Sequence, residues 1–239
     1  MPSGTKLDGP VHLPASGSRP DRVVVLLHGY GADGNDLIGM APPLSRWLPT
    51  AAFHAPSGSE SCEVWSEGRQ WFSMQAHDPY ELRRNPDRIR EAHQAMLAGA
   101  REAAPALDHY LDDLLRLYGL TASRMALVGF SQGTMMALHV AFRRPDAMAA
   151  VVGFSGALLG AGILGEEILV RPPVLLIHGQ EDPVVPVASL SLAESGLRTA
   201  GVEVSTRVRP GLEHGIDPDG LRQGARFLAE KFGGNGWRE

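Results

Sequence analysis

The chain of 239 residues contains one cysteine, Cys62. A single thiol can form neither an intramolecular disulfide nor a zinc site built from several cysteines, so both kinds of cross-link are excluded. This composition suits a reducing compartment, and we expect the protein to be cytoplasmic. Cys62 lies in a loop expected over residues 57–68, and nothing around it indicates a catalytic thiol.

Long apolar runs and clusters of basic residues are also missing. No stretch approaches the roughly 20 apolar residues that a membrane-spanning helix needs. Residues 1–20 lack the basic start and apolar core of a signal peptide. Lysine and arginine number 22 against 27 aspartate and glutamate, a net charge of -5, which argues against nucleic acid and anionic membrane as main partners.

An apolar content of 44% is that of a globular protein. Residues 1–20 are rich in proline, glycine and serine, so we expect a loosely held N-terminal segment. No internal repeat or long linker divides the rest. We therefore predict a single domain over residues 21–239.

Short apolar runs alternate with longer helical patterns along this domain. Alternating strands and helices predict an α/β fold with a mostly parallel central sheet and helices on both faces. Ligands bind such sheets at the carboxyl ends of the strands. Pro105 is expected to kink or break the long second helix. The predicted strands cover residues 23–27, 51–55, 125–130, 149–154, 174–178 and, nearer an edge, 202–208; the predicted helices cover 36–47, 87–118, 132–144, 189–200 and 217–232.

The sequence Gly129-Phe130-Ser131-Gln132-Gly133 lies between a predicted strand and a predicted helix. This is the G-x-S-x-G pattern of a nucleophile elbow, in which a tight turn lifts the serine hydroxyl clear of the sheet. The helix N-terminus beside Ser131 favours a developing oxyanion. Ser155 is a weaker candidate, because its motif also follows a strand but lacks the second glycine.

A serine nucleophile needs a histidine base, and the histidine needs a carboxylate that fixes its tautomer. Asp182 follows a predicted strand and suits the carboxylate role, with Glu181 as the alternative. Of nine histidines, only His214 follows both Ser131 and Asp182 on a loop after a strand. The order Ser, Asp, His is that of the α/β-hydrolase fold.

A glycine-rich loop over residues 28–34 follows the first strong strand. Such a loop can present a backbone N–H to an oxyanion, and the N–H of Gln132 would be the second donor. The loop lacks both common phosphate-binding patterns, which argues against nucleotide binding. No zinc-protease spacing occurs in the chain, so no metal is expected.

Four motifs together resemble the phospholipase/carboxylesterase family, which includes bacterial carboxylesterases and acyl-protein thioesterases. The resemblance runs from about residue 23 to about residue 232, nearly the whole chain. The motifs occupy residues 27–33, 129–133, 178–186 and 213–215.

The resemblance implies a serine carboxylesterase that acts on short- to medium-chain esters through an acyl-enzyme, without a cofactor. It implies that Ser131 is the nucleophile, His214 the base and Asp182 its partner. The oxyanion hole would be formed by the N–H groups of Tyr30 and Gln132. Eukaryotic thioesterases of the family usually have Leu-Gly-Asp where this chain has residues 30–33, which favours a bacterial esterase. The resemblance leaves a homodimer open.

Apolar residues between the predicted core elements form two groups that we expect to flank an acyl groove. The resemblance places the aromatic pair at positions 71 and 72 beside that groove. Local core packing explains the same residues equally well. The first group is Trp65, Trp71, Phe72 and Met74, and the second is Leu158, Leu159, Ile163 and Leu164.

Other functions fit the same residues. An acyl-protein thioesterase, a lysophospholipase or a peptidase would use the same triad, and the fold does not separate them. A dienelactone hydrolase fits less well, since its nucleophile is usually cysteine. A non-catalytic binding protein would usually lack a triad member, whereas every member is present here.

Overall fold

The computed structural model describes residues 6–14, 16–75 and 78–233. Its centre is a seven-stranded sheet in the order β1-β3-β2-β6-β7-β8-β9. Every neighbouring pair is parallel except β1 and β3. The predicted α/β class, its strands and the edge position of β9 are confirmed. The strands are β1 (Val11–His12), β2 (Arg22–Leu27), β3 (Ala51–His54), β6 (Met125–Phe130), β7 (Ala150–Phe154), β8 (Val174–Gly179) and β9 (Val204–Arg209), with a separate hairpin of β4 (Glu60–Ser61) and β5 (Arg69–Gln70).

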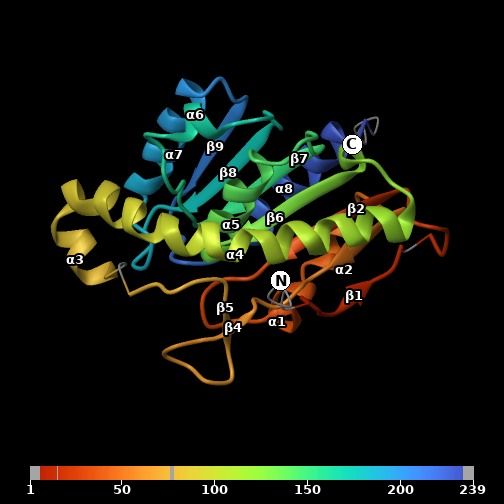
Figure 1. Ribbon diagram of the computed structural model, residues 1–239, viewed down its shortest axis with the longest axis horizontal. Helices are drawn as coiled ribbons and strands as arrows, with labels where there is room; N and C mark the ends of the chain where they lie inside the picture. Colours follow the sequence, from red (N-terminus) through yellow and green to blue (C-terminus); the bar gives the residue numbers. More distant parts are fainter. Residues whose placement is uncertain (1–5, 15, 76–77, 234–239) are drawn as a thin grey trace.

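Helices cover both faces of the sheet, and each face buries its own apolar cluster (Figure 1). Along β2, Val23 and Val25 pack toward one face, while Val24 and Leu26 pack toward the other. This follows from the two-residue side-chain period of a strand buried on both faces. The first face carries α4 (Ile89–Tyr118), α5 (Gln132–Ala141) and α7 (Ala188–Thr199); the second carries α1 (Gly34–Ile38), α2 (Ala41–Ser45) and α8 (Pro218–Lys231); α3 (Pro79–Arg84), α6 (Leu164–Glu167) and the 3₁₀ turns η1 (Pro86–Arg88) and η2 (Ala122–Arg124) complete the chain.

The sequence predicts a kink or a break at Pro105. Helix α4 is continuous through this residue, so a break is wrong. Proline leaves one carbonyl of the preceding turn without its helical partner. Pro105 is exposed, and on that side water can hydrate the carbonyl. The helix ends as predicted at Gly119, which has φ 66°.

The single helix predicted over residues 36–47 is also wrong, because the structure has two short helices there. Asp33 caps α1 by accepting from the N–H groups of Asn35 and Asp36. Pro42 and Pro43 have no N–H to donate to the preceding turn, so α1 cannot continue through them. The chain starts again as α2 instead.

Part of the segment expected to be loosely held belongs to the sheet. Val11 and His12 pair with β3, and Leu7 is buried in the core with 4% exposure. These contacts hold residues 6–14, which the polar composition of the segment did not reveal.

Helix α5 lies so close to β2 that only glycine fits at position 133. A Cβ there would lie 1.9 Å from the Leu27 carbonyl oxygen. We expect Gly133→Ala to lower the free energy of unfolding by about 3 kcal/mol, measured by urea denaturation. Gly162→Ala is the control, because a Cβ at Gly162 meets nothing within 4 Å. Equal losses in the two variants would contradict this account.

Candidate active site

Ser131 occupies the turn between β6 and α5, with φ 52° and ψ -117°. A non-glycine residue at positive φ is strained, at a cost of about 1–3 kcal/mol, and persists only where its surroundings fix it. The Ser131 N–H donates to the Phe154 carbonyl at 2.8 Å. The Thr134 hydroxyl lies 2.8 Å from the Gly129 carbonyl and 3.0 Å from that of Phe154. The elbow is therefore fastened to the neighbouring strand β7.

The Asp182 carboxylate, in the loop after β8, accepts four hydrogen bonds. Its Oδ1 accepts from the N–H groups of Val184 and Val185 at 2.8 and 2.9 Å. Its Oδ2 lies 2.8 Å from His214 Nδ1 and 3.3 Å from His178 Nε2. Burial acts to raise the pKa of Asp182, but the hydrogen bonds from the two histidines outweigh it and hold this pKa below its usual range.

The hydrogen bond to Asp182 fixes the tautomer of His214. A carboxylate only accepts, so Nδ1 carries the proton and Nε2 is left as an acceptor. The centroid of the His214 ring lies 4.9 Å from that of the Phe130 ring. Phe130 directly precedes Ser131 in the chain, so the imidazole lies beside the elbow. Among the described residues no hydrogen bond joins Ser131 to His214, a contact that is often long before substrate binds.

His178 has a second role that the sequence did not reveal. Its Nε2 donates to the Val185 carbonyl oxygen at 2.8 Å. The same nitrogen also faces Asp182 Oδ2. Both neighbours are acceptors, so Nε2 carries the proton and holds the carboxylate from the side opposite to its loop N–H groups.

We expect His178→Phe to lower the free energy of unfolding by about 3 kcal/mol, because it removes the donor to a buried carbonyl and a buried carboxylate. Urea denaturation at neutral pH measures the loss. His109→Phe is the control, since the His109 side chain is 71% exposed and should cost about 0.5 kcal/mol or less. If both variants lose the same amount, the contacts of His178 contribute nothing.

The backbone N–H groups of Tyr30 and Gln132 have no partner among the described residues. Gln132 is the first residue of α5, where the helix has no acceptor for its N–H. A Cβ at Gly29 would lie 3.3 Å from Ser131 Cβ, which places the loop carrying Tyr30 beside the elbow. Both donors can therefore serve an oxyanion formed at Ser131.

The loop after β2 is held by His28 and Trp71. His28 Nδ1 donates to the Gly29 carbonyl at 2.7 Å, and its Nε2 accepts from the Gly58 N–H at 2.8 Å. Burial lowers the pKa of His28, which favours this neutral form. Trp71 Nε1 donates to the His28 carbonyl at 3.0 Å. These contacts fix the backbone that presents Tyr30.

The side chain of Gln132 joins this loop system to the elbow. Its Oε1 accepts from the Trp71 N–H at 2.9 Å, and its Nε2 donates to the Phe72 carbonyl at 2.7 Å. The sequence indicated only the backbone N–H of Gln132. No sequence signal pointed to these side-chain contacts, because the partners lie about 60 positions apart.

The residues predicted to flank an acyl groove are mostly core residues. Trp65 is the exception, with 60% exposure. Met74 and Ile163 are half-buried, and the others are buried. Leu158 also lines a cavity between α4 and α7, so the acyl groove stays a prediction. The buried members of one cluster are Trp71, Phe72, Leu158, Leu159 and Leu164.

The alternative residues occupy different surroundings. Glu181 is exposed, whereas Asp182 makes the contact with His214. Ser155 has φ 46° and is buried, and its hydroxyl has no hydrogen-bond partner among the described residues. No helix follows it directly, so it lacks the helix N-terminus that stands beside Ser131. Cys62 is buried.

Within residues 6–14, 16–75 and 78–233, no group of three potential metal ligands is found. No helix in these residues is long and apolar enough to cross a membrane.

A profile described as Phospholipase/Carboxylesterase matches residues 12–231. Acyl-protein thioesterase 1 of Gibberella zeae is 26% identical over 243 residues, covering 93% of this chain and 95% of that protein. Esterase YpfH of Escherichia coli is 27% identical over 196 residues, covering 82% of this chain and 77% of that protein. The sequence similarity thus extends over most of the chain.

We compare the chain with two of the solved structures that resemble it. Esterase PE8 is 37% identical with a TM-score of 0.83, covering 94% of this chain and 99% of that one. A carboxylesterase from Mesorhizobium loti is 20% identical with a TM-score of 0.71, covering 92% of this chain and 94% of that one. Because the identity to the Mesorhizobium loti enzyme is only 20%, this similarity shows a shared fold alone.

Proposed function

Because the chain belongs to the phospholipase/carboxylesterase family and is a carboxylic ester hydrolase, we propose that Ser131, His214 and Asp182 are its catalytic triad. One observation carries the assignment: the 2.8 Å hydrogen bond from His214 Nδ1 to Asp182, made with the imidazole beside the elbow. The bond leaves the second ring nitrogen of His214 as the base that a serine nucleophile needs.

The reaction has two halves. His214 Nε2 takes the proton of Ser131 as Oγ bonds to the carbonyl carbon, and the carbonyl π electrons move to oxygen. The N–H groups of Tyr30 and Gln132 hold this oxyanion. The C–O bond then breaks, and His214 gives its proton to the leaving alcohol. Water attacks the acyl-serine in the same way, releasing the carboxylic acid and restoring Ser131.

The proposed substrates are short- to medium-chain acyl esters. The 37% identity to an esterase supports an ester as the substrate. The burial of most of the predicted groove residues supports a short acyl chain. Relatives named acyl-protein thioesterase make thioesters the second candidate.

Hydrolysis of p-nitrophenyl esters from acetate to palmitate tests the substrate class. We expect kcat/KM to peak at short or medium chains and to be lowest for palmitate. The reason is that most of the predicted groove residues are buried in the core and leave little apolar surface for a long chain. A parallel series of acyl thioesters, a lysophospholipid and a p-nitroanilide serves as comparison. A preference for long-chain thioesters, lysophospholipid or amide would replace the esterase proposal with the corresponding activity, and inactivity on all of them would favour a binding protein.

Cytoplasmic localisation remains part of this proposal, supported by the single free cysteine. The homodimer also stays a prediction, which light scattering of the purified protein checks.

A further inference from the structure

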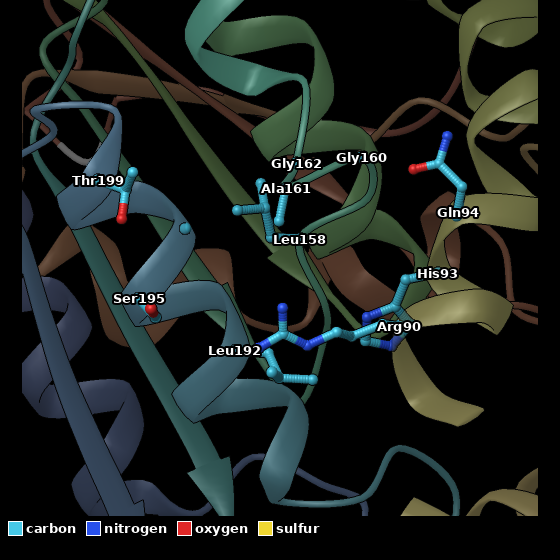
Figure 2. A pocket seen from close by; sticks show the side chains of 11 residues that line it. Arg90, His93, Gln94, Leu158, Gly160, Ala161, Gly162, Leu192, Ser195 and Thr199 are labelled. Carbon is cyan, nitrogen blue, oxygen red and sulfur yellow. The ribbon is translucent and has the colours of Figure 1, made fainter. Parts of the chain in front are cut away.

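A cavity of about 350 Å³ lies between α4, α7 and the loop that follows β7 (Figure 2). Its walls come from residues 90–94, 158–162 and 192–199. The volume is in the range of sites for small organic ligands. None of the residues proposed for the triad lines it.

Several polar side chains line the cavity, and Arg90 is the one that carries a permanent charge. Arg90, His93 and Gln94 project from α4, and Ser195 and Thr199 from α7; no aspartate or glutamate is among the lining residues. Figure 2 shows the Arg90 side chain extending from α4 toward α7. A guanidinium with no acidic residue in the cavity wall gives this cavity a positive charge, in a chain of net charge -5.

No acidic side chain among the described residues neutralises the charge of Arg90. Within the described ranges Arg90 makes no ion pair and no hydrogen bond. Glu91, the next residue after Arg90, is paired with Arg88 at 3.4 Å. Glu194, the residue before Ser195, is paired with Arg198 at 2.8 Å. Arg90 therefore remains available to an anion from outside.

The rest of the wall is apolar and small. Leu158 and Leu192 face the cavity beside Gly160, Ala161 and Gly162. The packing is close where α7 meets the loop after β7, since a Cβ at Gly196 would lie 2.9 Å from the Leu158 side chain. A ligand that fits has an anionic head at Arg90 and a short alkyl body against the leucines.

We propose that this cavity is a binding site for a small organic anion, a carboxylate or a phosphate monoester on a short alkyl chain. The guanidinium recognises either head group by paired N–H donors. The site is separate from the proposed triad, and the inference does not rest on ester hydrolysis.

Calorimetric titration with butyrate, n-butyl phosphate and butyramide tests the proposal. The amide has the shape of butyrate without its charge. We expect at least one anion to bind about tenfold more tightly than the amide, as for a hydrogen bond to a charged group, and to weaken as salt is added. The tighter of the two anions identifies the head group.

Three variants locate the binding. Arg90→Gln should weaken the anion about tenfold and leave the amide unchanged. Ser195→Phe, at an exposed position of α7, should fill the cavity and abolish binding. Arg226→Gln, an exposed arginine on α8, should bind as wild type does. The proposal is overturned if no probe binds at millimolar concentration, if butyramide matches both anions, or if Arg90→Gln or Ser195→Phe binds the anion as tightly as wild type; thermal melting confirms that each variant is folded.

Discussion

Ser131→Ala is expected to lower kcat/KM for p-nitrophenyl butyrate by about 10⁴- to 10⁶-fold. Alanine keeps the Cβ but has no hydroxyl to attack the carbonyl. It tolerates the φ of 52° no better and no worse than serine, so the strained elbow and its hydrogen bond to Phe154 should persist. Initial rates with the purified variant measure the loss, and an unchanged urea midpoint shows that folding is intact.

Ser155→Ala is the matched control for this variant. Ser155 is also a buried serine at positive φ just after a parallel strand, yet it lacks the features that the mechanism needs. We expect it to retain activity within a few-fold of wild type. A loss in Ser155→Ala as large as in Ser131→Ala, or full activity in Ser131→Ala, would sink the assignment of the nucleophile.

Asp182→Asn is expected to lower kcat by about 10⁴-fold. The two loop N–H groups need an acceptor, so the amide oxygen of asparagine stays at the position of Oδ1. The amide nitrogen then faces His214 Nδ1 and donates to it. The proton of His214 moves to Nε2, and the base that should accept from Ser131 is lost.

Glu181→Gln removes the same charge one residue earlier and is the control for Asp182→Asn. Because Glu181 is exposed, its variant should keep nearly all of the wild-type kcat. If the two variants lose equal activity, the effect is one of general charge and the orienting role of Asp182 is refuted.

Asp182 also makes stability depend on pH. Its pKa is lowered in the folded protein, where the hydrogen bonds from His178 and His214 outweigh burial. The stabilisation is therefore fully present above the pKa of an ordinary aspartate, about 3.9, and is lost as pH falls through the lower folded value. We expect the urea midpoint to fall on acidification below about pH 4, and to fall less steeply in Asp182→Asn; parallel curves would contradict the lowered pKa.

The fold could be predicted from the sequence where a segment has one clear hydrophobic pattern. The continuous apolar runs of β2, β6, β7 and β8 are buried on both faces, so their composition was sufficient. The relation of Asp182 to His214 followed from chain order, because loops after parallel strands meet at one edge of the sheet. Both side chains do come together there.

What the sequence concealed depends on contacts between distant segments. Trp71 looks like a groove residue until its indole N–H is seen to hold the His28 carbonyl. His178 could not be distinguished from other strand-end histidines without knowing that the chain turns back to bring Asp182 beside it. Pro105 was misjudged because a helix prediction does not know which side of the helix faces water.

The position of His214 after the edge strand β9 has a consequence for refolding kinetics. A refolding chain in which β2, β6, β7 and β8 have formed already contains Ser131 and Asp182, but its nucleophile has no base until β9 adds to β8. If β9 is the last strand to dock, recovery of esterase turnover lags behind recovery of the far-ultraviolet circular dichroism signal. The time between recovery of the circular dichroism signal and recovery of turnover then measures how long β9 takes to dock on β8.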